Sequence, residues 1–308
     1  MIHSGTSGKP TQKYSPKSFT FCLSFVLGLI AGCTTTPNAT PLGTNSQADA
    51  HTSPRLYVLD CGSINFSDVA PFGLTNEETT VRKLVVPCYL IDHPEGTLLW
   101  DTGLPANFAG NSEPVELPGG GGTVIYKKSL EDQLNELGYA TTDIDKIAFS
   151  HMHFDHTGSA NLFTNSQLLI QQSEFTAAFE EAEKFEGVFL PELYKDMANA
   201  RRRILNGDHD VFGDGSVQII SAPGHTPGHQ VLQLSLANSG PLILSGDLYH
   251  FRFSREHRRT PAFNYNAEDT LDSMDRVENL VQTLNADFWI QHDSDLFDTL
   301  RKSPAYYD

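Results

Sequence analysis

The chain has 308 residues, of which 39% are hydrophobic, so a globular core is feasible, although length alone does not choose between one domain and two. Its 38 acidic residues outnumber the 21 basic ones and give a formal charge of -17 at pH 7. Such a surface repels phosphate backbones, which argues against nucleic acid as a partner, and the simplest role of the acidity is solubility.

The first 32 residues are predicted to be a signal peptide. Three lysines between positions 9 and 17 precede an apolar run at 19–31, which is shorter than the roughly 20 residues of a membrane-spanning helix and is typical of a secretory signal. Its ending, Leu-Ile-Ala-Gly-Cys at 29–33, resembles the lipobox of bacterial lipoproteins. That resemblance implies an exported lipoprotein, anchored by lipid on Cys33 to the periplasmic side of a membrane, most simply the outer membrane.

A flexible tether is predicted at 33–54. The stretch is rich in Thr, Pro and Ala, and it cannot bury enough apolar surface to offset the entropy of ordering it. At Arg55 the pattern changes abruptly, and one domain is predicted for 55–308. That domain contains two cysteines, Cys61 and Cys88. An export compartment permits a disulfide between them, whereas two buried free thiols are the commoner outcome.

In the first half of this domain, short β-rich runs broken by Gly, Pro and Asp predict strands. Strands are expected at 55–62, 83–93, 97–103 and 146–150, and a helix at 129–138, where leucines recur at helical spacing. Residues 104–128 are predicted as a loop, either over a site or merely mobile.

The second half continues the same mixture of elements. Strands are expected at 167–171, 217–222, 229–236, 241–247 and 287–291, and helices at 173–185, 191–204 and 268–284. This order favours an α/β (α+β) domain in which two sheets pack face to face and helices lie outside.

The strongest chemical signal is Ser-His-Met-His-Phe-Asp-His-Thr-Gly at 150–158. His151 and His153 are two residues apart at the end of a strand, where alternate side chains share a face. Asp155 and His156 follow in the next turn. Imidazoles and a carboxylate are the ligands that zinc prefers, and four buried polar groups in one place would be costly without such a role.

Three more polar residues follow apolar strands in the same way, namely His225, Asp247 and His292. Each alone would be an ordinary loop residue more often than a ligand. Together with the cluster at 151–156, they predict a site for two metal ions.

These motifs resemble the signature of the metallo-β-lactamase superfamily, an HxHxDH motif followed by a His, an Asp and a last His. The resemblance implies an αββα sandwich with two zinc ions at one edge of the sheets. It implies that His151, His153 and His225 hold the first ion, that Asp155, His156 and His292 hold the second, and that Asp247 bridges both.

Within the superfamily the chain looks most similar to the N-acyl homoserine lactonases. The similar segments are 88–105, 150–163, 221–230 and 245–250. Those enzymes typically carry Tyr three residues after the bridging Asp, where this chain has His250 and Tyr249 lies one position earlier. They also have Gly before the last His, where this chain has Gln291, a departure expected to matter less.

This resemblance implies that a hydroxide shared by the two zinc ions opens the lactone ring of N-acyl homoserine lactones, as in quorum quenching. Asp155 would carry the proton to the leaving oxygen, and either His250 or Tyr249 would donate a hydrogen bond to the carbonyl oxygen. Asp101 is expected to orient a metal-bound imidazole, and His229 to brace the turn that carries His225.

Other readings stay open from sequence alone. A phosphotriesterase, thioester hydrolase or β-lactamase of the same fold is one alternative, although β-lactamases generally lack a bridging carboxylate and no Cys lies near the ligands here. A non-catalytic zinc-binding lipoprotein is another, but seven ligands for two ions leave positions open for catalysis. The native metal, the acyl-chain preference and the oligomeric state are not determined by the sequence.

Overall fold

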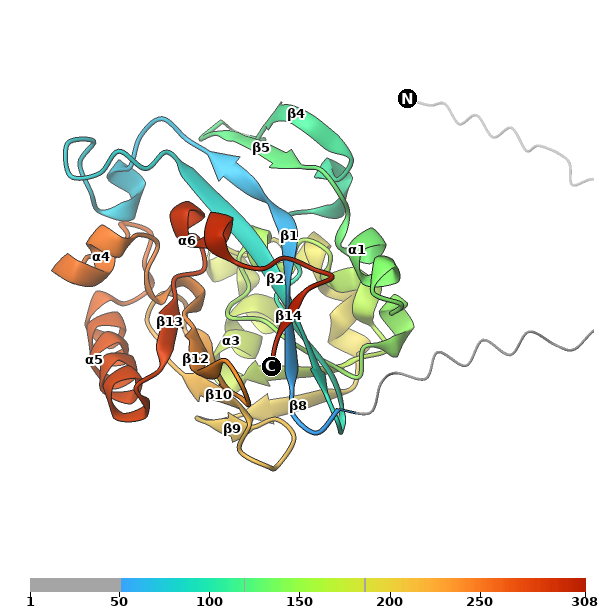
Figure 1. The fold of residues 1–308 in the computed structure, drawn as a ribbon. Helices are drawn as coiled ribbons and strands as arrows, with labels where there is room; N and C mark the ends of the chain where they lie inside the picture. The colour runs from blue at the N-terminus through green and yellow to red at the C-terminus, as the bar shows by residue number, and fades with distance from the viewer. Residues whose placement is uncertain (1–50, 119, 186) are drawn as a thin grey trace, which may run out of the picture. The chain divides into compact units, whose positions relative to one another are not determined.

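The computed structural model describes residues 51–118, 120–185 and 187–308. The expected signal peptide, Cys33 as the expected lipid site, and nearly all of the tether lie outside these residues. The described residues form two mixed β-sheets, and Figure 1 shows helices on both outer sides of the pair. The αββα sandwich predicted from the sequence is therefore confirmed.

The larger sheet has nine strands in the order β4-β5-β1-β2-β3-β6-β7-β8, with β14 paired to β1. Its strands are β1 (Arg55–Asn65), β2 (Lys83–His93), β3 (Gly96–Trp100), β4 (Asn111–Glu116), β5 (Thr123–Tyr126), β6 (Lys146–Ala148), β7 (Gln167–Gln171), β8 (Arg202–Leu205) and β14 (Tyr306–Tyr307). The smaller sheet has the order β13-β12-β11-β10-β9. Its strands are β9 (His209–Asp210), β10 (Val217–Ser221), β11 (Gln230–Leu236), β12 (Gly240–Leu244) and β13 (Asp287–Trp289).

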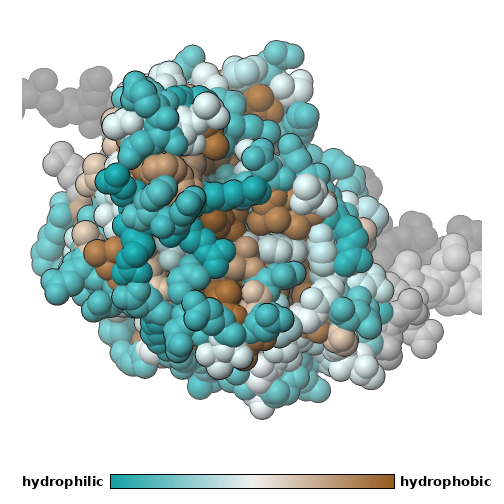
Figure 2. Space-filling view, turned by 60° about the vertical axis from the view of Figure 1, so that its left-hand side comes forward, coloured by the Kyte–Doolittle hydropathy of each residue, from teal (hydrophilic) through white to brown (hydrophobic). Residues whose placement is uncertain are grey.

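Six α-helices accompany the sheets in the described residues. They are α1 (Leu130–Glu136), α2 (Phe154–Thr157), α3 (Gln172–Phe175), α4 (Arg252–His257), α5 (Ala267–Leu284) and α6 (Ser294–Thr299). No helix among the described residues is long and apolar enough to cross a membrane. On the face shown in Figure 2, hydrophilic residues cover most of the surface and hydrophobic ones emerge in groups between them.

Alternating side chains give the sandwich three hydrophobic layers. On β1, Leu56 and Val58 pack between the sheets, whereas Tyr57 and Leu59 pack on the opposite face, under α1. On β11, Leu232 and Leu234 join the layer between the sheets and Val231 faces α5. Because side chains alternate between the two faces of a strand, each of these strands contributes to two hydrophobic layers.

Three expectations about local structure are wrong. The segment 104–128 contains β4 and β5, an edge hairpin whose first strand is polar and exposed and so lacks an apolar alternation. The helix expected at 173–185 is divided into α3, a π-helix (Thr176–Glu180) and a 3₁₀ helix (Ala182–Lys184). The expected helix at 191–204 is two 3₁₀ helices (Pro191–Leu193 and Lys195–Asn199) followed by β8, because residues 202–205 pair in parallel with β7.

Cys61 on β1 and Cys88 on β2 form a disulfide, with their Cα atoms 5.8 Å apart. Both residues are fully buried. The expectation of two free thiols is therefore replaced by a bonded pair.

We predict that Leu90→Ala lowers the free energy of unfolding by about 2–5 kcal/mol, because Leu90 is fully buried in the central strand β2 and its loss leaves a cavity. The exposed Leu162 is the matched control, and Leu162→Ala should change stability by no more than about 0.5 kcal/mol. Urea unfolding of both variants measures the difference. Equal losses would contradict the assigned core.

Candidate metal centre

The seven predicted ligands lie together in two groups, and within each group the potential ligand atoms are within 4.8 Å of one another. The first group is His151, His153, His225 and Asp247. The second group is Asp155, His156 and His292. Side chains from four separate segments, all but one of them buried, thus offer imidazole nitrogens and carboxylate oxygens for two cations.

Asp247 lies between the two groups. Its Oδ1 atom is 2.8 Å from His292 Nε2 and 3.3 Å from His156 Nε2, both in the second group. Its Oδ2 atom is 3.4 Å from His225 Nε2 and 3.7 Å from His151 Nε2, both in the first group. Because one carboxylate oxygen faces each group, Asp247 is placed to contact two cations at once.

Strand direction explains why these residues meet. His151 and His153 follow β6, and the short helix α2 then carries Asp155 and His156. In the smaller sheet, β10, β12 and β13 run in the same direction and are followed by His225, Asp247 and His292. The ligands therefore gather beyond the carboxyl ends of strands from both sheets.

Several polar atoms of the cluster have no hydrogen-bond partner among the described residues. They include the Nε2 atoms of His151 and His153. Buried polar groups are almost always hydrogen bonded, so unpaired atoms that converge on shared points are the arrangement expected of metal ligands. The donor set, imidazole and carboxylate, suits zinc.

The protonation states fit the same role in the first group. Burial lowers the pKa of His151 and of His225 well below the usual range, and it lowers the pKa of His153 to about 4. These three imidazoles are therefore neutral at pH 7, as metal coordination requires. Burial alone would raise the pKa of Asp247, but His292 and the neighbouring imidazoles hold it well below its usual value, so its carboxylate is ionised.

The imidazoles of the second group are more strongly influenced by nearby carboxylates. Burial alone would lower the pKa of His156, but Asp247, Asp155 and Asp101 together raise it well above its usual value. Burial alone would also lower the pKa of His292, but Asp247 and Asp155 raise it above its usual value. The carboxylates thus create a site that favours a cation in this position.

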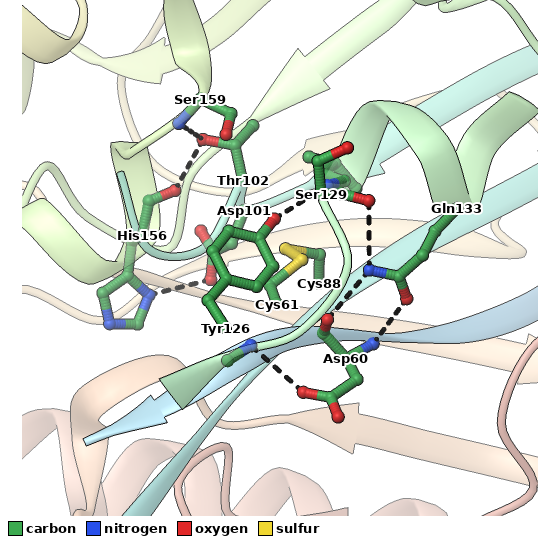
Figure 3. The surroundings of a disulfide bond; sticks show 12 residues. Asp60, Cys61, Cys88, Asp101, Thr102, Tyr126, Ser129, Gln133, His156 and Ser159 are labelled. Carbon is green, nitrogen blue, oxygen red and sulfur yellow. Dashed lines mark hydrogen bonds and ion pairs between the residues drawn. A yellow bond between two sulfur atoms is a disulfide. The ribbon is translucent and has the colours of Figure 1, made fainter. Parts of the chain in front are cut away.

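Asp101 orients one ligand, as expected from the sequence. Its Oδ2 atom is 3.0 Å from His156 Nδ1, and Oδ1 accepts a hydrogen bond of 2.7 Å from the Ser150 backbone N–H. Figure 3 shows Asp101 directed at the His156 ring. Gln291 Nε2 also donates to Asp101 Oδ2, at 2.6 Å, and Gln291 is buried. The departure at Gln291 therefore has a larger structural role than the sequence suggested.

Two further imidazoles are fixed by hydrogen bonds. His292 Nδ1 lies 2.7 Å from the Val85 carbonyl oxygen, so donating its proton there leaves Nε2 free to bind a cation. His229 Nδ1 lies 3.0 Å from the Ala222 carbonyl oxygen, and its Nε2 accepts from the Asp247 backbone N–H at 2.9 Å. His229 therefore braces the loop of His225, as predicted, and the loop of Asp247 as well.

Sequence reasoning missed Glu174 on α3. This buried carboxylate accepts hydrogen bonds of 2.8 Å from the backbone N–H groups of Met152 and Gly228. Met152 lies between His151 and His153, and Gly228 lies in the turn that holds His225. Glu174 thus connects the two loops that supply the histidines of the first group. It sits in an acidic run that resembles a solvated helix face, so the sequence carried no signal for it.

The structure separates the two candidates for a substrate contact. His250 Nε2 lies 3.0 Å from Asp247 Oδ2, whereas the Tyr249 hydroxyl donates to Glu278 at 3.1 Å and the Tyr249 ring packs with the α5 core. His250 also lines a cavity of about 300 Å³ beside the metal centre, and Tyr249 does not. The geometry therefore favours His250 over Tyr249.

This cavity has both apolar and polar lining residues, and the exposed Asp68 is among the polar ones. Its lining includes Ile64, Phe66, Phe72, Leu84, Phe154 and Phe263, together with His153, Asp155, Asp247, His250 and His292. The cavity can hold an apolar group while keeping a polar one at the ligands.

A model of the metallo-beta-lactamase superfamily matches residues 81–283. The N-acyl homoserine lactonase AttM of Azorhizobium caulinodans is 30% identical and covers 83% of this chain and 100% of its own length. The N-acyl homoserine lactonase AiiA of Bacillus thuringiensis subsp. kurstaki is 31% identical over 81% of this chain and 94% of its own length.

Solved structures show the same likeness. An N-acyl homoserine lactone hydrolase with the product N-hexanoyl-L-homoserine at its catalytic metal centre aligns with a TM-score of 0.69 and 28% identity, covering 83% of this chain and 100% of that one. The dizinc quorum-quenching lactonase AidC aligns with a TM-score of 0.60 over 83% of this chain and 94% of its own, and at 19% identity it supports the fold alone.

We predict that Glu174→Gln weakens zinc binding by the first group about 10–100-fold, because the new amide N–H₂ would face a backbone N–H donor in place of an acceptor. Glu183→Gln, an exposed acid on the following segment, is the matched control and should bind zinc normally. Zinc titration of the metal-free proteins measures both affinities. Unchanged zinc affinity in Glu174→Gln would refute the connecting role.

Proposed function

Because this chain belongs to the metallo-beta-lactamase superfamily and is similar within it to the N-acyl homoserine lactonases, we propose that it hydrolyses the lactone ring of N-acyl homoserine lactones. The observation that carries this proposal is the position of Asp247, with one oxygen toward each histidine group, beside a partly apolar cavity. The centre would hold the polar lactone, and the apolar wall would hold the acyl chain.

The two groups would hold two zinc ions, the first through His151, His153 and His225 and the second through Asp155, His156 and His292, with Asp247 shared. When bound, such a pair of ions makes water nucleophilic at neutral pH and polarises the substrate carbonyl. Hydrolysis adds water across the ester bond of the ring. The lactone carbonyl carbon becomes part of a carboxylate, and the ring oxygen becomes a hydroxyl.

His250 would position the lactone. Its ring packs against both Phe72 and Phe263, with centroids at 5.1 Å and 5.7 Å, and it lines the cavity beside Asp247. An imidazole N–H in this place can donate to the lactone carbonyl oxygen as negative charge develops on it. His250, which stands where the sequence resemblance would place Tyr, would thus take this role in this chain.

Asp155 would handle the proton. Its Oδ2 atom is 3.7 Å from His156 Nε2 and 3.8 Å from His292 Nε2, and the carboxylate also lines the cavity. A carboxylate that meets both the second group and the substrate can take a proton from water and deliver it to the ring oxygen that leaves. Its placement matches this double task.

The acyl chain would lie against the apolar wall of the cavity. Phe66 and Phe72 pack with their ring centroids 5.3 Å apart, and Ile64 and Leu84 complete this wall. The apolar side chains at these positions exclude water from the acyl chain and favour hydrocarbon over polar substituents.

We further propose that the chain is exported and carries lipid on Cys33. This rests on the basic stretch, the apolar run at 19–31 and the Leu-Ile-Ala-Gly-Cys ending at 29–33. Lactone hydrolysis would then take place on the periplasmic side of the membrane.

For the lactonase proposal, we predict that acid is released when the zinc-loaded protein meets an acyl homoserine lactone, as followed by pH-stat. Asp155→Asn should lower the rate about 10²–10⁴-fold, because it removes the proton carrier, and the exposed Asp272→Asn should leave the rate unchanged. No acid release from protein with both metal groups filled would exclude lactones, and thioesters and phosphotriesters would be tested next.

For the export proposal, we predict that bacteria expressing the chain incorporate labelled fatty acid into it at Cys33. Cys33→Ser should carry no label and should keep residues 1–32, because the lipidated cysteine directs cleavage before it. Mass spectrometry of the purified protein measures both. An unlabelled wild-type chain would contradict the proposal.

A further inference from the structure

The Cys61–Cys88 disulfide lies at an irregularity in β1. The pairing of β1 with β2 shifts register between Asp60 and Ser63, so Cys61 and Gly62 form a bulge. A bulge bends a strand and directs its extra residues away from the regular ladder. The disulfide joins this bulge to β2, the strand beside it.

The bulge packs directly on the loop that follows β3. A Cβ atom added to Gly103 would lie 2.2 Å from Cys61 Cβ and 3.1 Å from the Sγ atoms of both cysteines. One added to Gly62 would lie 2.5 Å from Leu104 Cδ1. The Leu104 backbone N–H also approaches the Cys61 carbonyl oxygen, at 3.4 Å. The sulfur atoms and this loop therefore have no free space between them.

The same loop holds the second metal group in place. Asp101 adopts a left-handed backbone conformation, with φ at 59°, that directs its carboxylate to His156 Nδ1. The Thr102 backbone N–H donates to the His156 carbonyl oxygen at 2.7 Å, and the Gly158 N–H donates to the Gly103 carbonyl oxygen at 2.8 Å. Figure 3 shows His156 hydrogen bonded to Asp101 and Thr102, with the disulfide nearby.

We propose that the Cys61–Cys88 disulfide is a positioning element of the second metal group. It holds the bulge of β1 against Gly103, and through Gly103 it holds Asp101 and His156. Two unbonded thiols cannot remain as close as two bonded sulfurs, and Gly103 leaves no room for them to separate on its side. Loss of the bond therefore shifts the loop and weakens the second cation site selectively.

A purely structural disulfide would behave differently. The bond closes a segment of 27 residues, and such a closure stabilises a fold by constraining the unfolded chain. That effect lowers the unfolding temperature when the bond is lost, but it leaves zinc affinity unchanged at temperatures where the protein stays folded.

Zinc titration of metal-free, full-length protein tests the proposal. The Cys61→Ala/Cys88→Ala variant should bind zinc at the second group about 10–100-fold more weakly, the range for loss of a contact that orients a ligand, with the first group unchanged. Leu236→Ala, which truncates a buried side chain at the end of β11, on the edge of the smaller sheet opposite the ligands, controls for lower stability and should bind both ions normally. Unchanged affinities in the cysteine variant would overturn the proposal.

A double-mutant cycle that combines the cysteine variant with Asp101→Asn tests whether the disulfide affects zinc binding through Asp101. If the disulfide acts through Asp101, the triple variant should bind zinc at the second group no more weakly than Asp101→Asn alone. Independent, additive losses would overturn the proposal. If the cysteine variants do not fold, wild-type protein purified with the pair oxidised or reduced, as verified by peptide mass spectrometry, provides the same comparison, and equal zinc binding by both forms would overturn it.

A loss of lactone hydrolysis in the cysteine variant would rest on the proposed function. The predicted loss of zinc affinity does not rest on it. A selective loss of zinc without any lactone hydrolysis by the wild type would refute the lactonase and leave the positioning role intact.

Discussion

The carboxylate of Asp247 lies between two groups of imidazoles, and the rest of the structure depends on this arrangement. The side chain is 4% exposed, and its two oxygens face different histidines, His292 on one side and His225 on the other. A buried carboxylate is costly unless cations or donors surround it. Here the surrounding nitrogens come from both sheets, so the position of one side chain requires the αββα sandwich to bring several strand ends together.

The contacts beyond the ligands follow from the same requirement, since each holds a ligand loop at a fixed place. Glu174 connects the loops of the first group through two backbone N–H groups, and His229 connects the loops of His225 and Asp247. Asp101 orients His156 in the second group and is itself held by Gln291. These contacts are buried and polar, so a displacement at any of them reaches a ligand directly.

The sequence predicted the parts of the structure that depend on local pattern. Apolar runs ending in His or Asp indicated both the strands and the ligands, because a strand end is where a scaffold exposes a polar side chain. Contacts that depend on strand register or on loop packing leave no recognisable pattern in the sequence and so were not predicted. The disulfide needed the pairing that places Cys88 opposite Leu59 beside the bulge, Glu174 looked like part of a solvated acidic face, and β4 is too polar to stand out as a strand.

Asp247 is placed as a ligand that two metal ions would share. The most direct test is a crystal structure of the zinc-loaded protein, with anomalous diffraction recorded on both sides of the zinc absorption edge. We expect two anomalous peaks, one among His151, His153 and His225 and one among Asp155, His156 and His292, with an Asp247 oxygen beside each. A single peak, or two peaks that Asp247 does not contact, would contradict this placement.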